Sequence, residues 1–115
     1  MDHAAWNTVD SLVAWLDAGS DLPPETRTIL QILKITEEAG EVAEAVIGAT
    51  GQNPRKGYSH TWEDVQAELC DVIVTAMVAL TRVNPDARQV FADNLSRIAA
   101  RSLAGPAPAA SPEPR

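Results

Sequence analysis

Residues 68–80 restrict the possible folds of this chain more than any other segment, because they predict a helix with apolar side chains on nearly every side. Such a helix must be covered by other elements on most sides. Two acids interrupt it, since Glu68 and Asp71 stand three residues apart and share one face. Burial of an unpaired carboxylate is costly, so the pair predicts a nearby cation. The apolar members are Leu69, Cys70, Val72, Ile73, Val74, Ala76, Met77, Val78, Ala79 and Leu80.

A second acidic pair, Glu38 and Glu41, has the same spacing inside a predicted helix at residues 25–47. This helix is two-faced. Its apolar arc, expected to face the core, holds Ile29, Ile32, Ile35, Val42, Ala43, Val46 and Ile47, and the opposite arc holds Lys34, Glu37, Glu38, Glu41 and Glu44. A solvated surface is the alternative interpretation of the acidic arc. The scarcity of balancing cations argues against that alternative.

Turn and capping signals divide the chain into four helices and a tail. Gly19 predicts the end of the first helix, and Thr61 with Asp64 predicts a capping box at the start of the third. We expect helices at about 2–18, 25–47, 62–83 and 85–103. They would form one all-α domain over residues 1–103, followed by a proline- and alanine-rich flexible tail over residues 104–115.

Composition excludes several classes of protein. A chain of 115 residues, 45% of them hydrophobic, supports one small domain with a modest core. The formal charge of −7 argues against binding to a nucleic acid polymer, although a bound metal would still allow a nucleotide ligand. The longest apolar run, 72–80, is too short to span a membrane, and the N-terminus does not resemble a secretory signal. We therefore expect a cytoplasmic protein in which Cys70, the single cysteine, is buried in the core.

If the two helices face each other, their acidic pairs would place four carboxylates around one point. Such a donor set suits a hard divalent cation, which favours Mg²⁺, with Mn²⁺ as the other candidate. A di-iron site is not favoured, because neither His3 nor His60 follows a glutamate by three residues. The alternative is structural: Glu68 and Asp71 would form salt bridges to Arg82 or Arg97.

The two pairs also follow a known order. The chain reads Glu37-Glu38-Ala39-Gly40-Glu41, then 26 residues, then Glu68-Leu69-Cys70-Asp71. This order resembles the E-E-x-x-E … E-x-x-D signature of the MazG-like all-α nucleoside triphosphate pyrophosphohydrolases, which are related to dimeric dUTPases and dCTP pyrophosphatases. The resemblance implies an antiparallel four-helix bundle completed by oligomerisation into a homodimer or tetramer. It also implies Mg²⁺-dependent hydrolysis of a nucleoside triphosphate to the monophosphate and pyrophosphate, as nucleotide-pool housekeeping.

The resemblance further implies roles for individual residues. The metal ligands would be Glu38, Glu41, Glu68 and Asp71. The catalytic candidates are Glu37, Glu38 and Lys34, of which Glu37 could add a ligand or position the attacking water. The candidates for holding the substrate phosphates are Asn94, Arg97 and Lys56.

No base-recognition signature is evident in the sequence. Trp6 is the best candidate for stacking on a nucleotide base, although a core or interface position would explain it without a ligand and is favoured. A second functional class also stays open, in which the chain is a non-catalytic helical module that binds a metal or a protein partner. The complete set of four acids favours the enzyme.

Overall fold

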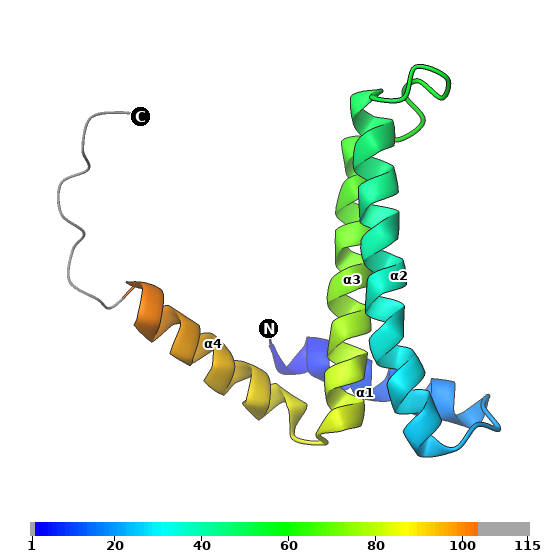
Figure 1. The fold of residues 1–115 in the computed structure, drawn as a ribbon. Coiled ribbons are helices and arrows are strands. Elements are labelled where there is room, and N and C mark those ends of the chain that lie inside the picture. The colour runs from blue at the N-terminus through cyan, green and yellow to red at the C-terminus, as the bar shows by residue number, and fades with distance from the viewer. Residues whose placement is uncertain (1, 104–115) are drawn as a thin grey trace.

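The computed structural model describes residues 2–103, which form four helices: α1 (His3–Ala18), α2 (Pro24–Thr50), α3 (Trp62–Val83) and α4 (Ala87–Leu103) (Figure 1). This part of the chain contains no strand, so the all-α prediction is confirmed. The predicted tail at residues 104–115 lies outside the described residues. None of the four helices is long and apolar enough to cross a membrane.

The helix boundaries follow local side-chain chemistry. The predicted capping box of α3 is confirmed: Asp64 N–H donates to Thr61 Oγ1 at 3.2 Å, and Thr61 N–H donates to the Asp64 carboxylate at 2.8 Å. The start of α4 differs from the prediction. The Asn84 side chain accepts from the Asp86 N–H at 2.8 Å, and this turn delays the helix to Ala87.

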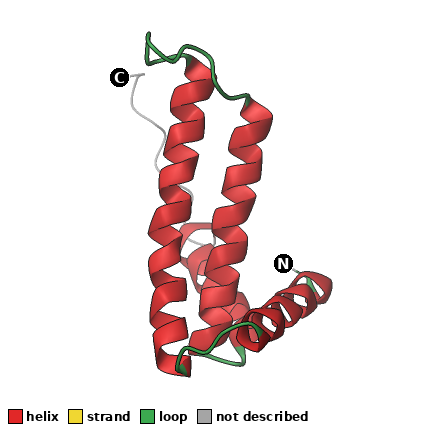
Figure 2. Ribbon diagram, turned by 90° about the vertical axis from the view of Figure 1, so that its right-hand side faces the viewer, coloured by secondary structure: helices red, strands yellow, loops and turns green. Residues whose placement is uncertain are grey.

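Helices α2 and α3 form an antiparallel hairpin and lie side by side in both views (Figures 1 and 2). Small side chains allow the two helices to approach closely, since Ala45 is 1% exposed and Gly48 is buried. A Cβ on Gly48 would lie only 2.2 Å from His60 Nδ1. The absence of a side chain at Gly48 therefore allows the loop that joins the helices to fold back against α2.

The main apolar contact lies at the foot of the hairpin, where α1 crosses α3 and α4 begins (Figure 1). We call this cluster the junction core. Trp6 is 3% exposed, and its ring lies 6.0 Å from that of Phe91, tilted by 55°. The residues of the junction core are Trp6, Val9, Met77, Val78 and Ala87, with Phe91 packed against them.

Two sets of polar contacts fix α1 against its neighbours. Asp17 of α1 lies between Arg82 of α3, at 2.8 Å, and Arg27 of α2, at 3.4 Å. Arg88 of α4 donates to α1 at Asn7 and forms an ion pair with Asp10 at 3.3 Å. These polar contacts thus connect all four helices at the foot of the hairpin.

Much apolar surface is left uncovered within one chain. The expectation that α3 is buried on most sides is wrong for a single chain, because Leu69, Ile73 and Val74 are exposed. Cys70 is also exposed, and not buried as predicted. The expected core arc of α2 likewise faces outward at Ile29, Ile32 and Ile47. Exposed apolar patches of this kind are typical of interaction sites.

Candidate metal centre

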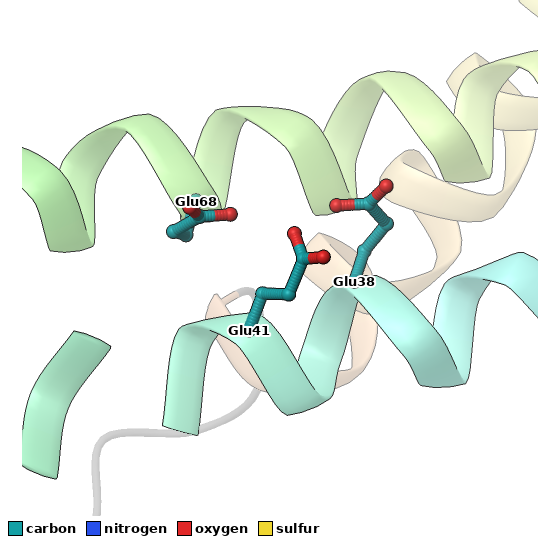
Figure 3. Close-up of side chains that lie close together, drawn as sticks. All are labelled: Glu38, Glu41 and Glu68. Atoms are coloured by element: carbon teal, nitrogen blue, oxygen red, sulfur yellow. The ribbon is translucent and has the colours of Figure 1, made fainter. Parts of the chain in front are cut away.

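Three carboxylates meet midway along the hairpin. Glu38 and Glu41 project from α2 and Glu68 from α3, toward one another across the gap between the helices (Figure 3). One carboxylate oxygen from each lies within 4.8 Å of the others. The spacing of three residues puts both α2 acids on the side that faces α3. We call these three residues the acidic cluster.

The cluster is partly withdrawn from solvent. Glu38 is 8% exposed, Glu68 is half-buried, and Glu41 is exposed. Within residues 2–103, Glu68 Oε2 is fully buried and has no hydrogen-bond partner. An unsatisfied buried oxygen on a charged group is costly, and a bound cation is one way to satisfy it. The acidic arc of α2 is therefore not simply a solvated surface, because Glu38 packs against α3.

Mutual repulsion dominates the electrostatics of the cluster. The negative charge of Glu38 raises the pKa of Glu41, with smaller contributions in the same direction from a hydrogen bond to Glu38, from burial and from Glu68. Like charges at this separation favour protonation of one member or the arrival of a positive charge.

Lys34 supplies a positive charge at the edge of the cluster. Its Nζ lies 3.1 Å from Glu37 Oε1 and 3.2 Å from Glu38 Oε1. The hydrogen bond to Glu37, followed by the one to Glu38, raises the pKa of Lys34. The structure thus brings all three predicted catalytic residues together, with Glu37 and Glu38 one helical turn before Glu41 and Lys34 two turns before it.

The fourth predicted ligand lies apart from the cluster. Asp71 is exposed, and it is not one of the residues whose oxygens converge. On α3 it stands almost one turn beyond Glu68, toward the foot of the hairpin. A change of rotamer or helix position would be needed to bring its carboxylate to the same point.

The predicted phosphate-binding residues are also dispersed. Asn94 and Arg97 lie on α4, where the Arg97 guanidinium donates to the Asn94 side chain. Both line a hollow with Leu80 and Phe91 in the angle between α3 and α4. Lys56 is exposed in the loop between α2 and α3. None of the three contacts the acidic cluster in the described chain.

Trp6 occupies the core position that the sequence allowed as the alternative to base stacking. The salt-bridge alternative for the α3 acids is not formed in the described residues: Arg82 pairs with Asp17, and Arg97 hydrogen-bonds to Asn94. Among the described residues, Glu68 therefore forms no ion pair that would explain its burial.

One polar contact beside the site was missed from the sequence. Gln31 of α2 donates from Nε2 to the Thr75 carbonyl of α3 at 3.2 Å, and Thr75 is 7% exposed. Gln31 lies one helical turn before Lys34, so the polar seam between α2 and α3 extends beyond the acids. A glutamine and a threonine at heptad spacing from Glu38 and Glu68 were the available signal.

The oxygen-only donor set of the cluster fits Mg²⁺ or Mn²⁺ better than softer metals. No protein-family model matches the chain, and comparisons with curated proteins and with solved structures also find no match. The functional assignment therefore depends on the site itself and on the motif that encodes it.

Proposed function

We propose that this protein is a Mg²⁺-dependent nucleoside triphosphate pyrophosphohydrolase of the MazG-like type. The observation that carries the proposal is the convergence of Glu38, Glu41 and Glu68, with one Glu68 oxygen buried and unsatisfied. A cation at this point would offset the repulsion that raises the pKa of Glu41. The same residues form most of the motif that resembles the pyrophosphohydrolase signature.

In the proposed reaction, water hydrolyses the bond between the α- and β-phosphates and releases a nucleoside monophosphate and pyrophosphate. A bound Mg²⁺ would supply charge neutralisation and a more acidic water. Glu38, Glu41 and Glu68 would hold the metal, and Asp71 would join them if α3 or its side chain shifts. Glu37, which forms an ion pair with Lys34 beside the cluster, would accept a proton from the attacking water.

Lys34 would contribute by binding phosphate. Its ammonium group lies between the carboxylates and open solvent, with about half of the side chain exposed. A substrate phosphate that displaced Glu37 from Lys34 would gain a charge-assisted hydrogen bond and free the Glu37 carboxylate. Binding of the substrate and release of the proposed base would then be coupled.

We further propose that the chain acts as a homodimer or tetramer in the cytoplasm, where nucleoside triphosphates are found. Association would complete the four-helix arrangement that the uncovered faces of α2, α3 and α4 leave open. It would also offer a route by which Asn94, Arg97 or Lys56 of one copy could approach the acidic cluster of another.

A pyrophosphate-release assay tests the activity. The protein is incubated with Mg²⁺ or Mn²⁺ and a panel of canonical and modified nucleoside triphosphates, and the products are identified by chromatography. Glu41→Gln and Glu68→Gln should lower kcat at least a hundredfold, because each removes a ligand charge. Glu44→Gln is the matched control on α2 and should keep full activity. Release of inorganic phosphate instead of pyrophosphate would contradict the proposed reaction.

The position of Asp71 keeps a second function open: a metal-binding or protein-interaction module without catalysis. Only three of the four expected ligands converge, and a three-ligand site could bind a cation without positioning a substrate. Saturable Mn²⁺ binding with no turnover of any nucleotide would favour this module. If Asp71→Asn abolishes turnover as fully as Glu68→Gln, the enzyme is favoured instead.

A further inference from the structure

A small hollow of about 190 Å³ lies toward the foot of the hairpin, where the turn after α1 meets α2 and α3 (Figure 1). Three of the nine lysine and arginine residues of this acidic chain line the hollow, and no acidic residue of the described chain does. Such a concentration of positive charge favours an anion as the occupant. The polar side chains that line the hollow are Ser20, Arg27, Gln31, Lys34 and Arg82.

The two arginines of the hollow share a single carboxylate. Arg82 Nη1 lies 2.8 Å from Asp17 Oδ1, and Arg27 Nε lies 3.4 Å from the same oxygen. Among residues 2–103, neither arginine forms an ion pair with any other acid. One negative charge thus faces two positive charges, and the excess positive charge lies at the hollow.

Each arginine also has a buried donor without an acceptor. In the described part of the chain, the Nε atoms of Arg27 and Arg82 are buried and form no hydrogen bond. The Arg82 side chain is only 8% exposed, so solvent has little access to its guanidinium group. Unsatisfied donors on buried charged groups are costly. Phosphate oxygens are the acceptors that guanidinium groups bind best, through paired N–H donors.

Two further donors border the hollow. The ammonium group of Lys34 has three N–H donors, of which Glu37 and Glu38 engage two. Ser20 Oγ accepts from the Leu22 N–H at 3.2 Å, which leaves the hydroxyl proton available to donate. Donors from α2, α3 and the turn after α1 could therefore reach one anion together.

The size of the hollow restricts the occupant to a small anion. Pockets that hold drug-sized ligands usually measure about 300–1,000 Å³, so a whole nucleotide would not fit here. Leu22 and Leu30 complete the wall beside the cationic groups. Apolar walls strengthen the attraction between the cations and an anion, because they lower the local dielectric constant.

We infer that this hollow binds a small phosphate anion, either inorganic phosphate or pyrophosphate, at a site separate from the acidic cluster. The anion would accept hydrogen bonds from Arg27 of α2 and Arg82 of α3 and connect both to the turn at Ser20. Its binding would stabilise the foot of the hairpin. The inference does not depend on hydrolysis of a nucleotide.

Titration calorimetry with inorganic phosphate and with pyrophosphate tests the site. A chelator excludes metal, and chloride holds the ionic strength constant. Each chain should bind one anion, and the anion with the lower Kd is the preferred occupant. Arg27→Gln should raise the Kd about tenfold or more, because it removes a charged donor. Arg55→Gln, in the exposed loop between α2 and α3, is the matched control and should keep the Kd of wild type. Absence of saturable binding at millimolar anion, or equal weakening by both variants, would overturn the inference.

A variant that strengthens binding separates this site from a loss of folding. Asp17→Asn removes the carboxylate that competes with the anion for Arg27 and Arg82. Phosphate should therefore bind Asp17→Asn several-fold more tightly than wild type, although the fold itself becomes less stable. Weaker binding by Asp17→Asn would mean that the arginines serve the fold alone.

The acidic cluster provides the last comparison. Glu68→Gln should keep the Kd for phosphate in the presence of the chelator, since Glu68 does not line the hollow. Binding that requires Mg²⁺ and is lost in Glu68→Gln would place the anion at the acidic cluster and refute a separate site. Anion binding by a protein that hydrolyses no nucleotide would support the hollow and contradict only the proposed reaction.

Discussion

The junction core and the acidic cluster share α3, yet the two regions satisfy different physical requirements. At the lower end of α3, Met77 and Val78 are buried against Trp6, so apolar contacts stabilise the fold. Midway along, Glu68 faces two glutamates and carries a buried oxygen without a partner. One helix thus carries a region that stabilises the fold and a region where its carboxylate is repelled by those of α2. Such a contrast is expected where residues are kept for binding and not for stability.

The largest effect is expected from truncation at the junction core. Trp6→Ala should lower the free energy of unfolding by about 3–5 kcal/mol, because it removes the central ring of the cluster. Chemical denaturation followed by circular dichroism measures the change. Trp15→Ala is the control on the same helix, since Trp15 is 71% exposed and should cost less than about 0.5 kcal/mol. Similar losses from both variants would show that the junction core is not the main stabilising region.

The acidic cluster should become stabilising when a cation is present. A metal that binds only the folded chain adds about 2.7 kcal/mol at a hundredfold excess over its Kd. Thermal unfolding with increasing Mg²⁺ or Mn²⁺ should therefore show a rising Tm. Glu68→Gln should remove most of this rise, whereas Glu44→Gln should preserve it. A rise that persists in Glu68→Gln would place the bound cation elsewhere.

The ion pairs of Asp17 with Arg82 and Arg27 join α1 to the hairpin. Their contribution to the free energy of unfolding should be smaller and should depend on pH. The hydrogen bond from Arg82 lowers the pKa of Asp17 below its usual 3.8, and the charges of Arg82 and Arg27 act in the same direction, against an opposing effect of burial. A lowered pKa stabilises the folded chain above the usual value, and this contribution is lost as the pH falls through the folded pKa. Asp17→Asn should therefore lower stability at pH 7, and the difference from wild type should disappear as the pH falls below 3.8 and through the folded pKa.

Asp21→Asn is the control for this comparison, because Asp21 is exposed in the turn after α1. Denaturant midpoints measured across the pH range provide the data for both variants. A constant difference between Asp17→Asn and wild type at every pH would mean that packing, and not ionisation, gives Asp17 its role.

The smallest expected change in stability is a gain and not a loss. Repulsion from Glu38 and Glu68 raises the pKa of Glu41 above its usual 4.5, so ionised Glu41 destabilises the folded chain at neutral pH. In the presence of a chelator, Glu41→Gln should unfold at a higher denaturant concentration than wild type. The gain should disappear as the pH falls below the usual pKa of the carboxyl, where both forms are neutral.

Addition of Mg²⁺ should reverse this order, because wild type then gains a ligand that Glu41→Gln lacks. Glu44→Gln again serves as the control and should follow wild type under both conditions. If Glu41→Gln is the less stable protein even with the chelator, repulsion does not dominate the cluster.

The sequence predicted most of the helices because their end signals are local. Asp64 three residues after Thr61 is sufficient to define the start of α3. The start of α4 was predicted slightly early, since Asn84 caps a turn in place of the helix itself. Which face of each helix is covered and which is exposed was less predictable. The apolar arc of α2, including Ile29 and Ile47, was expected inside but lies outside in a single chain.

The same difficulty limited the prediction of the site. The motif identified Glu38, Glu41 and Glu68 correctly as neighbours, because helical spacing and an antiparallel hairpin determine their approach. The motif could not show that Asp71 stays apart from the acidic cluster. It also could not show that Asn94 and Arg97 lie far from the cluster on α4, since their position depends on the angle between α3 and α4. That angle depends on tertiary contacts such as those of Arg88, which no local pattern encodes.

The close approach at Gly48 bears on the candidate metal centre. Gly48 holds the loop end of the hairpin together, while Arg82 and Arg27 hold the foot through Asp17. The acidic cluster lies between these two sets of contacts, which limit how far α2 and α3 can separate. A divalent cation at the acidic cluster would have to suit this gap, so its ionic radius would affect which metal binds. A bulkier residue at position 48 would change which ion fits without touching any ligand.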